Sequence, residues 1–192
     1  MEKKILITCF EPFGGDGFNA SAAVAGAMAE SIGGLRAEKL VLPVEFGRAA
    51  EIAAARVREL RAGIIVMLGE ARARKAVTPE LLAINLNHAS IPDNAGAVPQ
   101  DEPIVSGGAA AYFTPFPARA LAEKISNAGV PAALSYSAGA YVCNDLYYRI
   151  LREFEGSGTR AVFVHVPRAD GEEAYKKMAF AISSALADTI DG

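Results

Sequence analysis

The stretch Gly63–Gly69 constrains the fold more than any other part of this sequence. Its central residues, Ile64 to Leu68, are all apolar, and a glycine stands at each end. A strand that is apolar at every position must be buried on both faces, as central parallel strands are when helices cover each side. The sequence therefore predicts a sheet with helices packed on both of its faces.

Strand-like and helix-like segments alternate on either side of this run. Apolar spacing predicts further strands at 5–8, 37–44, 132–135 and 161–166, with 78–86 extended. It predicts helices at 22–31, 49–60, 117–128, 141–154 and 172–190, the first capped by Asn19 or Ser21. This order indicates an α/β fold, a three-layer α/β/α sandwich around a central, mostly parallel, twisted sheet. Residues 90–117 carry five prolines and little periodicity, which predicts a long functional or assembly loop.

Length and composition narrow the range of functions. The 192 residues predict a single domain, 1–192, and the net charge of −3 without a basic stripe argues against a nucleic-acid partner. The apolar run near the N-terminus is too short for a signal sequence or a membrane span, so we expect a cytoplasmic protein with no membrane partner. The hydrophobic fraction of 52% favours a homo-oligomer, and the two cysteines are expected to be free thiols.

Cys143 and His165 are the candidates for nucleophilic chemistry. Cys143 stands at the start of a predicted helix, whose unpaired N–H groups are expected to lower the thiol pKa and to hold an oxyanion. His165 ends a predicted strand on the carboxyl side, where open α/β sheets place their ligands. Local pattern alone leaves a second interpretation open, in which both are buried core residues. The spacing of the cysteines and histidines matches no zinc site, and no phosphate-binding loop is present, so we expect neither metal nor cofactor.

Several motifs fall in one unbroken order between Ile5 and Pro167. They are Phe10-Glu11-Pro12-Phe13-Gly14-Gly15, Glu80 with Ala83 and Asn85, Ile91-Pro92-Asp93-Asn94, Asp101-Glu102-Pro103-Ile104-Val105, Ser137-Ala138-Gly139 through Cys143-Asn144, and His165-Val166-Pro167. Together they resemble pyroglutamyl peptidase I, the pyrrolidone-carboxylate peptidase family of cysteine peptidases.

The resemblance implies an exopeptidase that removes N-terminal pyroglutamate from peptide substrates without metal or cofactor, commonly as a homotetramer. It implies Cys143 as nucleophile, His165 as general base and acid, and Glu80 as the carboxylate that orients the histidine. Phe10 and Phe13 match the aromatic residues around the pyrrolidone ring, and Asn19 matches a residue of the loop that supports them. Val142, within the nucleophile motif, is a candidate substrate-binding residue.

The sequence also departs from the family pattern. Ser90 stands where the family usually has an arginine associated with oxyanion stabilisation. Either Ser90 and backbone groups bind the substrate there instead, or a nearby cation replaces the arginine, with Arg72 and Arg74 as the candidates. Glu70 stands where some members have glutamine; its carboxylate is a candidate acceptor for the lactam N–H, or it favours a substrate that bears an amine. Leu81 replaces a basic residue after Glu80, and Cys9 replaces a glycine, which is expected to place a second thiol close to the pocket.

These departures keep other functions open. One is a weakened or substrate-shifted homologue that acts on another N-acyl or lactam amide, or that only binds cyclised N-termini. Another is a thiol redox sensor that uses Cys9 and Cys143. His88 is interpreted as a surface residue.

Overall fold

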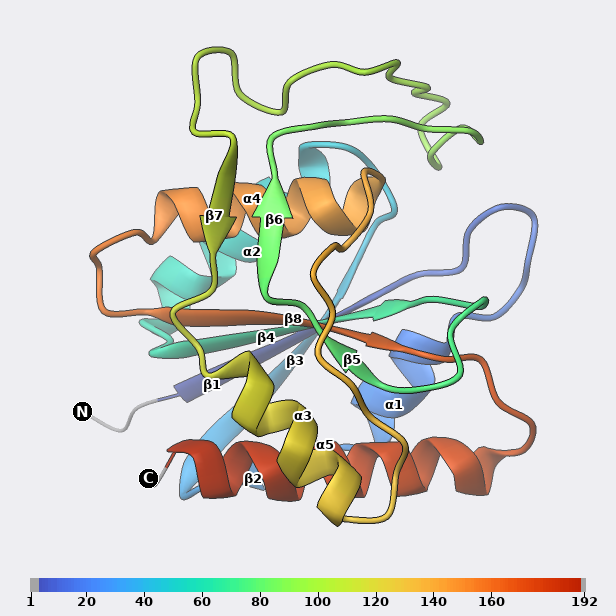
Figure 1. Ribbon diagram of the computed structural model, residues 1–192, viewed down its shortest axis with the longest axis vertical. Coiled ribbons are helices and arrows are strands. Elements are labelled where there is room, and N and C mark those ends of the chain that lie inside the picture. Colours follow the sequence, from blue (N-terminus) through green and yellow to red (C-terminus); the bar gives the residue numbers. More distant parts are fainter. Residues whose placement is uncertain (1–3, 191–192) are drawn as a thin grey trace.

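A six-stranded sheet forms the centre of the computed structural model, which describes residues 4–190 (Figure 1). The strands lie in the order β2 (Ser31–Ile32), β3 (Leu35–Leu42), β1 (Lys4–Phe10), β4 (Ile64–Glu70), β8 (Arg160–Val166) and β5 (Thr78–Pro79). The four inner strands are parallel, whereas β2 and β5 pair antiparallel at the edges. The apolar run therefore lies in the sheet interior, between β1 and β8, as predicted.

Helices cover both faces of the sheet, which confirms the predicted α/β/α layering (Figure 1). One layer consists of α1 (Ala20–Ala27), α3 (Ala118–Asn127) and α5 (Glu172–Ile190). The other layer consists of α2 (Arg48–Leu60) and α4 (Val142–Glu153). Each layer packs its own apolar core against the sheet.

The alternation of strand side chains decides which layer each residue faces. In β8, Val164 belongs to the core beneath α1, α3 and α5, whereas Phe163 belongs to the core beneath α2 and α4. Successive side chains of a strand point to opposite faces. His165, two residues after Phe163, therefore faces the layer that contains α4, and Cys143 lies in the first turn of that helix.

Four local predictions differ from the structure. The helix predicted at 22–31 ends at Ala27, and Ser31 begins the edge strand β2 instead. Residues 132–135 form no strand; Ala132 and Ser135 make only single bridges, to Val77 and Glu80. The segment 78–86 is extended, but it divides between β5 and β6 (Leu82–Ile84). The predicted loop 90–117 contains a short strand, β7 (Ala111–Phe113), which pairs with β6 in a separate two-stranded sheet.

The helices also bear on the question of membrane insertion. Of the helices in residues 4–190, none combines the length and the apolar character needed to cross a membrane.

Candidate active site

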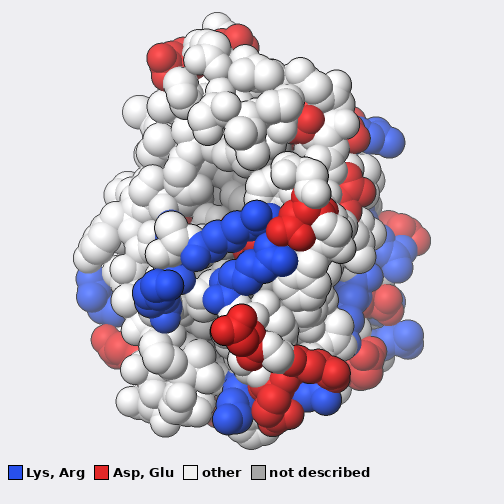
Figure 2. Space-filling view, turned by 90° about the vertical axis from the view of Figure 1, so that its right-hand side faces the viewer, with Lys and Arg blue, Asp and Glu red and all other residues white. Residues whose placement is uncertain are grey.

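A small cavity of about 130 Å³ opens at the carboxyl ends of β1, β4 and β8. Its lining residues are Phe10, Phe13, Asn19, Val44, Glu70, Ala138, Tyr141, Val142, Cys143 and His165. Figure 2 views the molecule from this end and shows a hollow, with Lys and Arg side chains crossing the surface just beneath it. The structure thus brings most of the predicted site residues, from five separate chain segments, into one place.

His165 and Glu80 form the buried polar pair of this site. His165 Nδ1 lies 2.7 Å from Glu80 Oε1, and the Glu80 side chain has no exposed surface. A carboxylate only accepts hydrogen bonds, so Nδ1 carries the proton and Nε2 of the neutral ring is left as an acceptor. The backbone of Glu80 is fixed as well, because its N–H donates to Phe163 O and its carbonyl accepts from Tyr147 Oη.

Cys143 fits beside the sheet because β4 has a glycine at the adjacent position. Gly69 pairs with His165 in the β4–β8 register. A Cβ built on Gly69 would lie 3.0 Å from Cys143 Sγ and 2.7 Å from Phe163 Cζ, so any side chain here would collide with both. The absence of a side chain at Gly69 therefore leaves space for the thiol next to the histidine strand.

The first turn of α4 supplies hydrogen-bond donors around the thiol. The N–H groups of Asn144 and Asp145 bond to Tyr141 O. Those of Val142 and Cys143 come before the first intrahelical acceptor, because the opening N–H groups of any helix have no partner within it. Both residues line the cavity, so these donors are available to a developing oxyanion.

The pKa of the Cys143 thiol was expected to be lowered, but the surroundings of Cys143 raise it. Burial raises the pKa of Cys143 to about 12, and the Glu80 charge adds to this, while Arg74 and the backbone N–H of Cys143 oppose it. Burial also lowers the pKa of His165, with the hydrogen bond to Glu80 acting the other way. The helix N-terminus does favour the thiolate, but desolvation outweighs it. The resting pair is a neutral thiol and a neutral imidazole.

Aromatic side chains form one wall of the cavity. Phe10 is buried at the end of β1, and Phe13 follows in a turn whose Gly14 and Gly15 have positive φ angles. Phe13 packs against Tyr141, with ring centroids 6.3 Å apart. Asn19 supports this loop as the N-cap of α1: its side chain accepts from Ser21 N and donates to Glu11 O at 2.9 Å.

The carboxylate of Glu70 is not directed at the cavity. One oxygen accepts from Ala20 N at 2.6 Å, and the other is paired with Arg72. The side chain has no exposed surface although the residue as a whole is 9% exposed, so the part that faces the cavity is main chain. The carboxylate instead holds the N-terminus of α1, where a negative charge is favourable.

Arg72 and Arg74, the proposed replacements for the absent arginine, are engaged elsewhere. Arg72 stacks over the Phe13 ring at 5.3 Å and pairs with Asp16 and Glu70. Arg74 bonds to Glu80, Thr78 and the carbonyl of Ser137. Ser90 is exposed and does not line the cavity. The backbone N–H groups at the start of α4 are thus the candidate donors that remain for an oxyanion.

The second thiol lies on the other side of the sheet. Cys9 is 3% exposed, contacts Leu40 O at 3.8 Å, and belongs to the core of α1, α3 and α5, whereas Cys143 packs against the core of α2 and α4. Both cysteines are free. The expectation that Cys9 stands close to the pocket is wrong, because its position in β1 has the opposite parity to that of Phe10.

His88 lies on the surface, as expected. Its ring Nδ1 is 3.0 Å from Asp101 Oδ1 and the side chain is 44% exposed.

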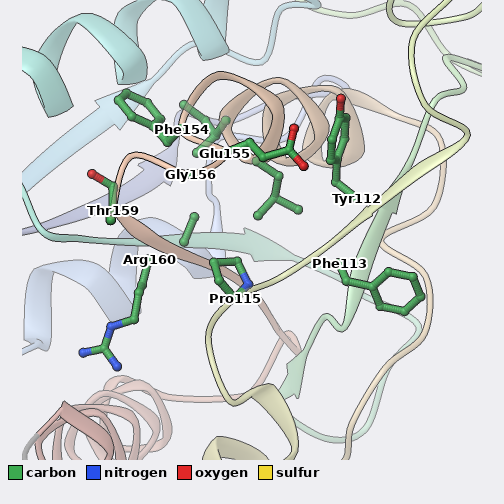
Figure 3. A pocket seen from close by; sticks show the side chains of 12 residues that line it. Tyr112, Phe113, Pro115, Phe154, Glu155, Gly156, Thr159 and Arg160 are labelled. Atoms are coloured by element: carbon green, nitrogen blue, oxygen red, sulfur yellow. The ribbon is translucent and has the colours of Figure 1, made fainter.

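A larger hollow of about 410 Å³ lies at the opposite end of β8 (Figure 3). Tyr112 and Phe113 stand on one side of it and Thr159 and Arg160 on the other, with Glu155 near α4. No cysteine or histidine lines it, so it has no nucleophile and base of the kind found in the smaller cavity. Within residues 4–190, no group of three or more Cys, His, Asp or Glu side chains is arranged to hold a metal ion.

The sequence interpretation missed two residues that shape the site and gave Arg74 a different role. Gly69 and Tyr141 shape the cavity around Cys143, and Arg74 was considered only as an oxyanion donor. Tyr141 stands two residues before Cys143, and that proximity was the available signal. Nothing local marks Gly69 as the partner of a thiol 74 positions later in the chain.

Comparison with known proteins gives a consistent result. A family model described as pyroglutamyl peptidase matches residues 3–190. The pyrrolidone-carboxylate peptidase of Levilactobacillus brevis is 41% identical over 85% of this chain and 81% of its own length. That of Enterococcus faecalis is 37% identical over 97% of this chain and 88% of its own.

Solved structures agree with the sequence matches. Pyroglutamyl peptidase I from Bacillus amyloliquefaciens superposes with a TM-score of 0.89 at 34% identity, covering 97% of this chain and 96% of that one. Pyrrolidone carboxyl peptidase from Thermococcus litoralis gives 0.88 at 33% identity, covering 98% and 95%. With its sheet order, its cavity and these matches, the chain belongs to the pyroglutamyl peptidase family of cysteine hydrolases.

Proposed function

We propose that this protein hydrolyses the amide bond after an N-terminal pyroglutamyl residue of a peptide, with Cys143 as nucleophile, His165 as base and acid, and Glu80 as the carboxylate that orients His165. The observation that carries the proposal is the single cavity that contains Cys143 and His165 together with an aromatic wall. The names of the relatives support the substrate class, since they are pyrrolidone-carboxylate peptidases.

The cavity suits a flat, uncharged lactam. Its walls are mostly apolar, from Phe10, Phe13, Val44, Tyr141 and Val142. Glu70 and Asn19 contribute polar groups to the lining, on the side of the cavity formed by β4 and the start of α1. An open-chain glutamate would bring a carboxylate into this small space without a cation to pair it, and burying an unpaired charge costs several kcal/mol. The site therefore favours the cyclised residue.

The first step transfers a proton within the neutral pair. As Cys143 Sγ attacks the carbonyl carbon of the pyroglutamyl residue, its proton passes to Nε2 of His165. The imidazolium that forms is stabilised by Glu80, which already accepts from Nδ1. The carbonyl oxygen gains the negative charge and is held by N–H groups at the start of α4.

The second half of the reaction regenerates the thiol. The tetrahedral intermediate collapses as His165 gives its proton to the leaving amine, which departs as the shortened peptide and leaves a thioester on Cys143. Water then attacks the thioester, with His165 again taking the proton. Pyroglutamate leaves, and Cys143 recovers a proton from His165.

The test compares three arylamide reporters, pyroglutamyl, prolyl and glutamyl, with Cys143→Ser as the blank. We expect release of arylamine from the pyroglutamyl reporter only, and stoichiometric alkylation of the wild type by iodoacetamide at Cys143. Cleavage of another N-acyl or lactam amide in place of the pyroglutamyl reporter would overturn the substrate assignment, and equal rates for wild type and Cys143→Ser would overturn the nucleophile.

We also propose that the protein acts in the cytoplasm as a homo-oligomer. Two free thiols fit a reducing compartment. Large apolar side chains remain exposed on the described surface, and burial in an assembly would remove them from water; they are Val41, Ile91, Val98, Phe113, Tyr136 and Phe180. Light scattering coupled to size exclusion tests the assembly, and a monomeric mass at micromolar concentration would contradict it.

A further inference from the structure

Arg74 contacts the buried triad carboxylate and the chain that leads to the nucleophile. It stands in the turn between β4 and β5, and its Nη1 donates to Glu80 Oε1 at 2.5 Å. The same oxygen lies 2.7 Å from His165 Nδ1. Arg74 Nη2 donates to Ser137 O at 3.0 Å, six residues before Cys143. One guanidinium therefore joins Glu80 to the loop that precedes α4.

The charge of Glu80 needs a partner because the side chain is fully buried. Its second oxygen, Oε2, has no hydrogen-bond partner in the described part of the chain. The charged or titratable groups that face Glu80 are His165 from β8, the Cys143 thiol and the Tyr147 phenol from α4, and Arg74. The guanidinium of Arg74 keeps its positive charge at any ordinary pH, and its contact with Glu80 offsets the cost of burying this anion.

Arg74 also affects the proton transfer itself. Its charge lowers the pKa of both His165 and Cys143. It therefore favours the neutral imidazole, which accepts the proton in the first step, and the thiolate, which attacks the carbonyl carbon. Its side chain is only 28% exposed, so bulk water screens these effects little. A residue in this place influences turnover without touching the substrate.

We propose that Arg74 is a positioning residue of the hydrolysis: it holds the Glu80 carboxylate against His165 and ties it to the Ser137 loop ahead of Cys143. The inference rests on the proposed function. It replaces the hypothesis of an oxyanion donor, since both terminal nitrogens of Arg74 are already bonded to Thr78, Glu80 and Ser137. Arg74 acts through Glu80, so its effect should depend on the presence of Glu80.

A double-mutant cycle tests this dependence. Arg74→Met in the wild type should lower kcat about tenfold or more while KM changes less than about threefold, because Arg74 itself does not line the substrate cavity. In a Glu80→Gln background the same change should cost less than about threefold, since the carboxylate it supports is gone. Equal factors in the two backgrounds, or a loss confined to KM, would overturn the proposal.

Two further variants control for charge and for folding. Lys75→Met removes a positive charge from the neighbouring exposed residue and should leave kcat within twofold of wild type. Arg74→Lys keeps the charge but cannot reach both Glu80 and Ser137, so it should recover part of the lost kcat. Thermal unfolding of each variant identifies folding defects. If Arg74→Met does not fold, Arg74→Lys replaces it in the comparison of kcat between the two backgrounds. A Lys variant no better than Met, with both folded, contradicts the proposed role.

The rate of Cys143 alkylation separates this inference from the substrate assignment. Iodoacetamide reacts with the thiolate and requires no substrate. Cys9 is buried and should react slowly, and peptide mass mapping distinguishes its alkylation from that of Cys143. Arg74→Met should slow alkylation of Cys143 severalfold, whereas Lys75→Met should not. If no reporter is cleaved but this difference holds, the substrate proposal fails and the role of Arg74 stands. An unchanged rate overturns the role.

Discussion

Replacing Gly69 with alanine tests the geometry on which the whole site depends. The added Cβ would stand 2.7 Å from Phe163 Cζ, 2.8 Å from Phe163 Cε1 and 3.0 Å from Cys143 Sγ. Phe163 is fully buried and packed between Tyr147 and His165, whose ring centroids lie 5.8 and 4.8 Å away, so its ring has little room to move. The thiol must therefore shift, together with the ring.

Two separate losses follow from this collision. Overpacking a buried site costs about 1–3 kcal/mol of unfolding free energy, or about 2–4 °C in Tm for each kcal/mol in a chain of this size. A displacement of the nucleophile of about 1 Å costs about 10²-fold in rate. We therefore expect Gly69→Ala to fold, to melt several degrees lower and to lose about 10²-fold in kcat/KM against the pyroglutamyl reporter.

Gly26→Ala provides the matched control. Gly26 lies in α1, and a Cβ added there would meet no atom within 4 Å. Alanine at this position should therefore raise the unfolding free energy by about 0.5–1 kcal/mol and leave kcat/KM unchanged. The double variant Gly69→Ala, Phe163→Leu should recover stability but not activity, because the contact with Sγ remains. Wild-type kcat/KM in Gly69→Ala, with the protein folded, would refute the assigned position of the thiol.

Three further results are expected. Because burial lowers the pKa of His165, the neutral base persists below pH 6.5, and the acid limb of kcat/KM should have its midpoint below that value; a midpoint above 6.5 would contradict the burial argument. Burial raises the pKa of Cys9 to about 11 from its usual 9.0, so above pH 9 the unfolded chain releases a proton that the folded chain keeps, and the unfolding free energy should fall by about 1.4 kcal/mol per pH unit from this thiol. Urea titrations at pH 9 and 10 should show a smaller fall of the unfolding free energy in Cys9→Ala than in the wild type. An equal fall in the two proteins would contradict the raised pKa of Cys9. Glu70→Gln removes the charge that holds Ala20 N and Arg72, so it should raise KM severalfold and lower Tm; an unchanged KM would show that the anchored loop does not support the Phe13 wall.

The long elements were predictable because their signals are local. The apolar run of β4, the amphipathic spacing of α2 and the cap at Asn19 all depend on residues close together in the sequence. The strand β7 has three residues and gains its order by pairing with β6, so no periodicity could show it. Residues 132–135 have strand-like composition, but they meet their neighbours only through single bridges.

The site shows the same division between local and distant causes. Motif order indicated Cys143, His165 and Glu80, but the thiolate expectation was wrong because it considered only the helix N-terminus and not the desolvation by packed neighbours. The roles of Glu70 and Arg74 also depend on distant contacts, with Ala20 and Ser137 respectively. Sequence proximity carries no information about such partners.

The sheet that separates Cys9 from Cys143 also determines how the protein responds to peroxide. A sulfenic acid formed on Cys143 has no resolving thiol in its own chain, because the other sulfur faces the opposite helical layer. Rescue must then come from a small thiol that diffuses into the cleft, and delay allows irreversible over-oxidation. Preparations stored without reductant should lose turnover in a form that dithiothreitol restores early and fails to restore later.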